Sequence, residues 1–203
     1  VLEMTTAVFG FQPGQNLSPF GGLNEFLSAL LALRCLADHL TMAQLLQVGT
    51  CIEATVPFRK KDKDGAPCQR LFTRLLKVNQ SFELGLSTQE LVKAVQSAQE
   101  LANRDVGNFG TTDRAWFLDN TWRLLPESNS PLRQAGFYMV SEYQGALQKM
   151  TGFFSTLEPD VIFGSFMDKP EPEGVARMTR RARRNIEVGR QYLRAKLVTM
   201  SML

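Results

Sequence analysis

An amphipathic segment near the C-terminus places the strongest constraint on how this chain can fold. Across residues 175–200, apolar side chains recur every three or four positions. At about 100° per residue they gather within a sector of about 100°, which is the pattern of a helix that packs by one side. The apolar set is Val175, Met178, Ala182, Ile186, Gly189, Leu193, Leu197 and Met200. We therefore expect one long helix here, with its opposite side in solvent.

The same segment holds most of the excess positive charge of the chain. Residues 175–197 contain seven Arg and one Lys against a single acid, Glu187, which gives a net charge of +7. Because the whole chain of 203 residues carries +3, the remainder carries −4. Guanidinium groups favour planar, two-point contacts with phosphate or carboxylate, so we assign nucleic-acid binding to this set. On the predicted helix Arg177, Arg180, Arg181 and Arg184 lie opposite the apolar side, Arg183, Arg190 and Arg194 flank it, and Lys196 completes the set.

Helical signals also recur through much of the preceding chain. The clearest is a capping box formed by Ser87 and Glu90, which predicts a helix from there to about Asn103. Apolar residues at helical spacing extend the pattern to other segments. We therefore expect a mainly α-helical single domain, with a helical body over residues 23–174 followed by the basic helix over 175–203.

Residues 1–22 differ in character from this body. Glycine and proline recur too densely there for a helix, so we expect an extended N-terminal arm. Phe9, Phe11 and Phe20 are spaced along it. These rings either anchor the arm in a neighbouring subunit or cover apolar surface of their own chain, and we take them as candidate subunit-interface residues.

A charged stretch in the body predicts a small β-hairpin near residues 50–78. Two runs containing β-forming residues flank an Asp-Gly pair, which favours a tight turn. The second run could equally begin a helix. The expected tip carries Arg59, Lys60 and Lys61, which either lie in solvent or contact phosphate, and we include them among the candidate nucleic-acid-binding residues.

The sequence offers little support for catalysis or for a metal site. His39 is the single histidine, and the three cysteines form no CxxC pair. Phosphate-loop, dinucleotide-binding, nucleophile-elbow and zinc-protease motifs are missing from the sequence. The apolar runs are shorter than the roughly 18 residues that a membrane span needs. We expect a protein without enzyme activity, metal, cofactor or membrane span, located inside the cell or a virion, or in an organelle matrix if a transit peptide is removed.

The basic helix and the aromatic arm together favour a structural protein. The leading hypothesis is a non-enzymatic protein that binds nucleic-acid backbone with little sequence specificity and assembles with copies of itself, in the manner of a nucleocapsid or coat protein. RNA is the expected nucleic acid. The alternative is an accessory subunit of a large protein complex that uses the Arg-rich helix to dock on an acidic protein. A solvated or membrane-facing helix is the third interpretation of the same charges.

Overall fold

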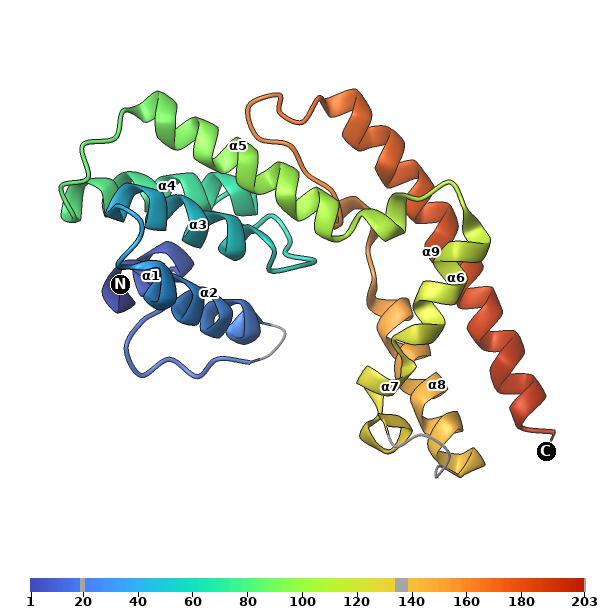
Figure 1. The fold of residues 1–203 in the computed structure, drawn as a ribbon. Coiled ribbons are helices and arrows are strands. Elements are labelled where there is room, and N and C mark those ends of the chain that lie inside the picture. Colours follow the sequence, from blue (N-terminus) through green and yellow to red (C-terminus); the bar gives the residue numbers. More distant parts are fainter. Residues whose placement is uncertain (19–20, 134–138, 203) are drawn as a thin grey trace. The chain divides into compact units, whose positions relative to one another are not determined.

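The computed structural model describes residues 1–18, 21–133 and 139–202, and the fold is mainly helical, which confirms the predicted fold class (Figure 1). The chain forms two compact units. The N-terminal unit contains residues 1–106 and 163–175, and the C-terminal unit contains residues 107–162 and 176–203. Within the described residues, no helix combines the length and the apolar character needed to cross a membrane.

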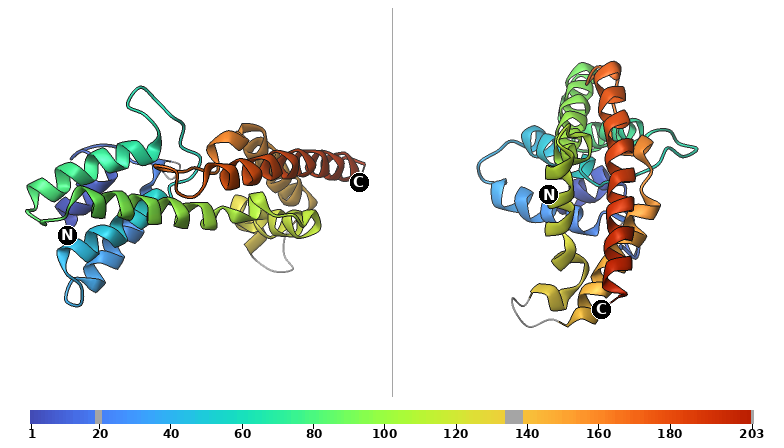
Figure 2. Two further views of the ribbon diagram at one scale, coloured as in Figure 1. Left: turned by 90° about the horizontal axis from the view of Figure 1, so that it is seen from above. Right: turned by 90° about the vertical axis from the view of Figure 1, so that its right-hand side faces the viewer.

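The N-terminal unit is a bundle of helices around one apolar core. Its helices are α1 (Leu2–Phe9), α2 (Leu23–Leu36), α3 (Met42–Ala54), α4 (Pro67–Ser81) and α5 (Thr88–Asp105). Helix α3 packs against α2 and α5, and α5 also packs against α4, as the further views show (Figure 2). The core includes Leu33, Leu45, Leu75 and Val95, whose side chains are fully or almost fully buried.

The predicted capping box is confirmed at the start of α5. The Ser87 backbone N–H donates to Glu90 Oε2 at 2.8 Å, and the Glu90 backbone N–H donates to Ser87 Oγ at 3.3 Å. Thr41 and Gln44 make the same reciprocal pair at the start of α3. Side-chain acceptors therefore satisfy backbone donors that a helix start leaves without partners.

The possible hairpin near residues 50–78 does not form, and the alternative that its second run begins a helix is confirmed. Its first run lies largely in α3 and its second in α4, and the turn between them holds only an isolated bridge between Asp62 and Gly65. Pro67 suits the first turn of α4, because its missing N–H would have no helical partner there. Leu71, Leu75 and Val78 then follow at helical spacing and are buried, so packing overrides the β-forming residues in the run.

The expected extended arm is also wrong over its first half. Residues 2–9 form α1, and Met4, Val8 and Phe9 point into the core. Gly10 ends the helix with φ 72°, a left-handed conformation that glycine adopts without strain. The chain then runs without helix from Phe11 to Ser18.

The C-terminal unit contains helices separated by short turns. These are η2 (Gly107–Gly110), α6 (Arg114–Arg123), α7 (Leu125–Ser128), η3 (Ser130–Arg133), α8 (Val140–Thr156), η4 (Pro159–Val161) and most of α9 (Pro172–Met200). Helix α9 is the predicted basic helix, confirmed with a start at Pro172, and ends near the C-terminus in Figure 1. Phe117 of α6 and Phe154 of α8 pack with ring centroids 6.2 Å apart. Gly189 of α9 lies against Phe154, so its missing side chain permits close helix packing.

Candidate nucleic-acid interface

The buried side of α9 determines which of its side chains face outward. Ala182, Ile186 and Leu193 are buried, in agreement with the predicted apolar side. Asn185 lies beside them, and its amide donates to the carbonyl oxygens of Phe109 and Thr111, each at 2.9 Å. These contacts fix the rotation of α9 about its axis within the C-terminal unit.

Three arginines on the outward side form the arginine row, which we define as Arg180, Arg181 and Arg184. At about 100° per residue they lie roughly 100° to 160° away from Ala182 around the axis. All three are exposed, and within the described parts of the chain none has a carboxylate oxygen within 4.0 Å. Like charges four residues apart repel by a few tenths of a kcal/mol, as Arg180 and Arg184 do here. The row is therefore a concentrated positive charge that forms no ion pair with the described residues of its unit.

Two other candidate nucleic-acid-binding residues lie on the surface of α9, close to the arginine row in the sequence. Arg177 is exposed and lies one turn before Arg181 on the same side of α9. Arg194 is exposed further along the helix, and no described carboxylate oxygen lies within 4.0 Å of it. Arg194 can extend the contact of a flexible polyanion with α9.

Arg183 and Arg190 instead bind groups of their own unit. Arg183 Nη2 lies 2.7 Å from Asp160 Oδ1, in a pair that is exposed on both sides and therefore weak. Arg190 Nε donates to the Phe154 carbonyl at 2.9 Å, and its Nη2 donates to the Leu157 carbonyl at 3.1 Å. These carbonyls end α8, where a cation is favourable. The assignment of Arg190 to phosphate binding is therefore corrected to a structural role.

Lys196 lies over aromatic rings of the same unit. Its Nζ is 5.3 Å from the ring centroid of Trp122 and 5.6 Å from that of Tyr192. Both distances are within the range of a cation–π contact. The sequence predicts a phosphate contact for Lys196 and gives no signal for its position over Trp122.

Arg59 in the N-terminal unit is also corrected to a structural role. Its guanidinium donates to Glu53 Oε2 at 3.2 Å and to the Glu53 carbonyl at 3.1 Å, and it forms an ion pair with Oε1. Arg74 pairs with the same carboxylate, which has no exposed surface. Burial lowers the pKa of the Arg74 guanidinium from its ordinary value, although the Glu53 charge opposes this shift. Sequence distance concealed this pairing, since Arg74 is 21 residues from Glu53.

Lys60 and Lys61 are exposed on the loop between α3 and α4. Arg70 holds this loop, since its Nη1 donates to the Gly65 carbonyl at 3.0 Å and forms an ion pair with Asp62. That hydrogen bond from Arg70 is the main reason why the pKa of Asp62 is lowered. The loop therefore presents its lysines from a fixed turn and not from a hairpin.

Phe9 and Phe11 pack inside the N-terminal unit. Their ring centroids are 5.6 Å apart, and they lie 5.3 Å and 5.2 Å from the ring of Phe26. Phe9 keeps only 5% of its surface exposed. The subunit-interface assignment of Phe9 and Phe11 is thus corrected in favour of packing on their own chain, and Phe20 lies outside the described residues.

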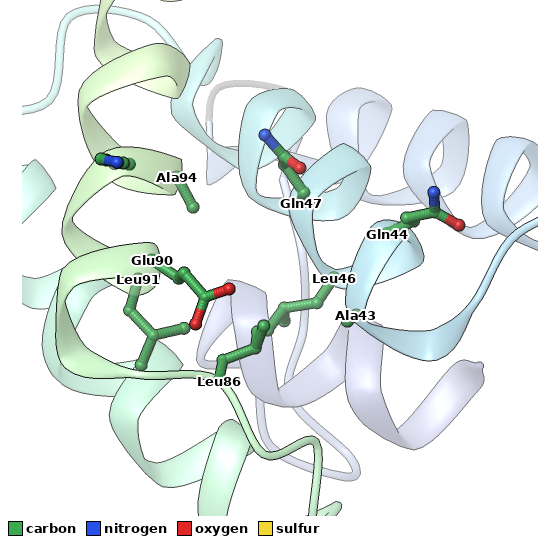
Figure 3. Close-up of a pocket in the computed structure, with 9 residues that line it drawn as sticks. Ala43, Gln44, Leu46, Gln47, Leu86, Glu90, Leu91 and Ala94 are labelled. Atoms are coloured by element: carbon green, nitrogen blue, oxygen red, sulfur yellow. The ribbon is translucent and has the colours of Figure 1, made fainter.

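A groove of about 310 Å³ lies between α3 and α5 of the N-terminal unit. Figure 3 shows its lining, in which Leu46 and Gln47 of α3 face Leu91 and Ala94 of α5. The other side chains that line it are Ala43, Gln44, Leu86, Glu90 and Lys93. The Gln44 and Glu90 side chains are already used in the two capping boxes, so the groove offers mainly apolar contact.

Comparison with known proteins adds no family to these observations. The chain matches no family model, no curated protein and no solved structure. Among the residues that the structure describes, no three His, Cys, Asp or Glu side chains are grouped so that they could hold a metal ion.

Proposed function

We propose that this chain is a non-enzymatic nucleic-acid-binding protein that holds the phosphate backbone on the outward side of α9. The observation that supports the proposal is the arginine row. Its guanidinium groups are exposed, close together and without a described carboxylate partner. Phosphate is the anion that such a cluster binds best when it is repeated along a flexible strand.

The position of the row limits how the backbone is recognised. Arg180 and Arg184 are separated by about 6 Å along the helix axis, since each residue adds about 1.5 Å. Contacts between guanidinium groups and phosphates position a strand but carry no information about its base sequence. We therefore expect binding that depends strongly on salt and weakly on base sequence, and RNA remains the expected ligand.

The test is a titration of the protein with a fluorescent single-stranded RNA of mixed sequence at several salt concentrations. Each phosphate contact contributes a slope of about 0.7 in log affinity against log salt on single strands. The double variant Arg181→Glu with Arg184→Glu should therefore lower the slope by about 1.4 and weaken binding about tenfold or more.

A matched control is Arg34→Glu with Lys77→Glu, which removes the same charge from exposed helix positions of the N-terminal unit. This control should keep the slope of the unchanged protein. Equal losses in the two double variants would show a general charge effect and contradict the proposal. A polyglutamate chain that competes as well as RNA of equal charge would instead favour the accessory-subunit alternative.

Self-assembly stays a separate prediction. The sequence bases it on the aromatic arm, whereas Phe9 and Phe11 have partners in their own unit. Light scattering with and without RNA tests it directly. A mass of one chain under both conditions would remove assembly from the proposed function and leave nucleic-acid binding unaffected.

A further inference from the structure

A group of three aromatic side chains lies in the C-terminal unit, one from each of three helices. Trp122 belongs to α6, Tyr143 to α8 and Tyr192 to α9. The Trp122 ring centroid is 5.4 Å from that of Tyr143 and 6.1 Å from that of Tyr192, both in edge-to-face arrangements. Each side chain is half-buried and so keeps part of its surface in solvent. We call this group the aromatic cluster.

The cluster carries a cation on its ring faces. The Lys196 ammonium is placed over both Trp122 and Tyr192. A lysine ammonium stays hydrated and so does not belong to an apolar core. Because Trp122 and Tyr192 are both half-buried, part of their surface remains in contact with solvent. A flexible lysine can leave such a position when a better partner for the rings arrives.

The aromatic cluster borders the arginine row on α9. Tyr192 follows Arg181 by 11 residues, which at about 100° per residue places it about 20° from Arg181, about 80° from Arg184 and about 120° from Arg180 around the axis. The same count gives a separation of about 16 Å along the helix. A strand whose phosphates lie on the row can thus bring neighbouring nucleotides to the rings without crossing to the buried side.

We propose that the aromatic cluster stacks unpaired bases, so that the ligand of α9 is single-stranded nucleic acid. This inference rests on the proposed function, because the backbone contact brings the bases to the rings. Only a single strand offers base faces for stacking, since bases in a duplex are paired and stacked with one another. Lys196 then moves from the ring faces to a phosphate of the stacked nucleotide.

A purely structural role makes a different prediction. If Trp122, Tyr143 and Tyr192 only brace α6, α8 and α9 against one another, the presence of bases on the ligand has no effect. The comparison can therefore be made with the unchanged protein, using strands that carry the same phosphates with and without bases.

The experiment measures the affinities of a uridine strand of about 12 nucleotides, an abasic strand of equal length and a duplex of equal length. We expect the uridine strand to bind about tenfold or more tightly than the abasic strand, with a similar salt slope. Tryptophan fluorescence supplies a second readout in the Trp116→Phe variant, whose remaining tryptophan is Trp122. The uridine strand should change this emission and the abasic strand should not.

A variant pair identifies the rings responsible. Tyr192→Leu should weaken uridine-strand binding about fivefold or more and leave abasic-strand binding unchanged. Trp116→Phe is the matched control, since Trp116 is exposed on α6 outside the cluster. Equal binding of uridine and abasic strands by the unchanged protein would overturn the stacking proposal and leave backbone binding intact. Failure to bind either strand would overturn the proposed function itself.

Discussion

Arginines of this chain behave in opposite ways in its two units. In the N-terminal unit, Arg59 and Arg74 converge on Glu53, a carboxylate with no exposed surface. In the C-terminal unit, the arginine row lies in solvent without a described acid within 4.0 Å. The first arrangement uses guanidinium groups to satisfy a buried charge, and the second leaves their charge available to a ligand.

The comparison shows that the number of basic residues in a segment does not identify a binding surface. Arg59 belongs to a run of basic residues in the sequence, yet its donors are occupied by Glu53. Arg190 belongs to the most basic helix and caps the end of α8. Binding capacity depends on which guanidinium groups lack partners within the fold.

The largest expected effect comes from removing the buried carboxylate. Glu53→Gln leaves Arg59 and Arg74 close together without a counter-charge. Breaking a buried ion pair by removing one partner costs about 3 kcal/mol or more, and partial exposure of both arginines places this site near the lower value. Urea denaturation should therefore show a loss of about 3 kcal/mol in the free energy of unfolding.

The matched change in the arginine row is Arg181→Gln with Arg184→Gln. These exposed side chains have no described ion pair to lose, so the free energy of unfolding should stay within about 0.5 kcal/mol. If both variants lose stability equally, the contrast between the two groups of arginines is wrong.

The next largest effect concerns the close packing of α8 and α9 in the C-terminal unit. A Cβ atom at Gly189 would lie 2.5 Å from Phe154 Cε1, which is closer than real Cβ contacts. Gly189→Ala should therefore force the helices apart and cost about 1–3 kcal/mol of unfolding free energy. Gly152→Ala in α8 is the control, because no atom outside its own helix backbone lies within 4 Å of its Cβ position. That change should be neutral or stabilising by up to about 1 kcal/mol, since alanine favours helices.

A smaller effect on stability distinguishes the structural role of Arg190 from the ligand-binding role expected of Arg194 on the same helix. Arg190→Ala removes the hydrogen bonds to the Phe154 and Leu157 carbonyls and should lower the unfolding free energy by about 1 kcal/mol. Arg194→Ala should leave stability unchanged and lower the salt slope of RNA binding by about 0.7. Denaturation and RNA titration of both variants check the two roles. A salt slope that falls for Arg190→Ala alone would reverse the assignment.

The sequence predicted those elements whose signal is local. The capping box at Ser87 and the apolar side of α9 depend on residues within one or a few helical turns, and both are confirmed. The hairpin prediction failed because β-forming residues in the 69–78 run also have helical spacing. Pro67 and the repeat of buried positions in α4 were the signals that could have corrected it.

The candidate site could be predicted only in part, because pairing is set by tertiary contacts. The outward side of α9 follows from its periodicity. The partner of Arg183 lies 23 residues away, and those of Arg190 lie 33 and 36 residues away in the sequence. No spacing rule connects such positions. The grouping of the aromatic rings has no sequence signal for the same reason, since Trp122, Tyr143 and Tyr192 come from three separate helices.

The smallest expected effect concerns the loop that carries Lys60 and Lys61. The hydrogen bond from Arg70 lowers the pKa of Asp62, so the folded protein binds a proton there less readily than the unfolded chain does. This pair therefore contributes stability above the unfolded pKa of Asp62, and the contribution is lost as the pH falls through the lower folded pKa. Arg70→Gln should raise the pKa of Asp62 toward its ordinary value, which a carboxyl-carbon NMR titration measures. An unchanged pKa would mean that the ion pair between Arg70 and Asp62 does not hold this loop. The N-terminal unit would then use arginine to satisfy a carboxylate only at Glu53, and its contrast with the arginine row would rest on that one site.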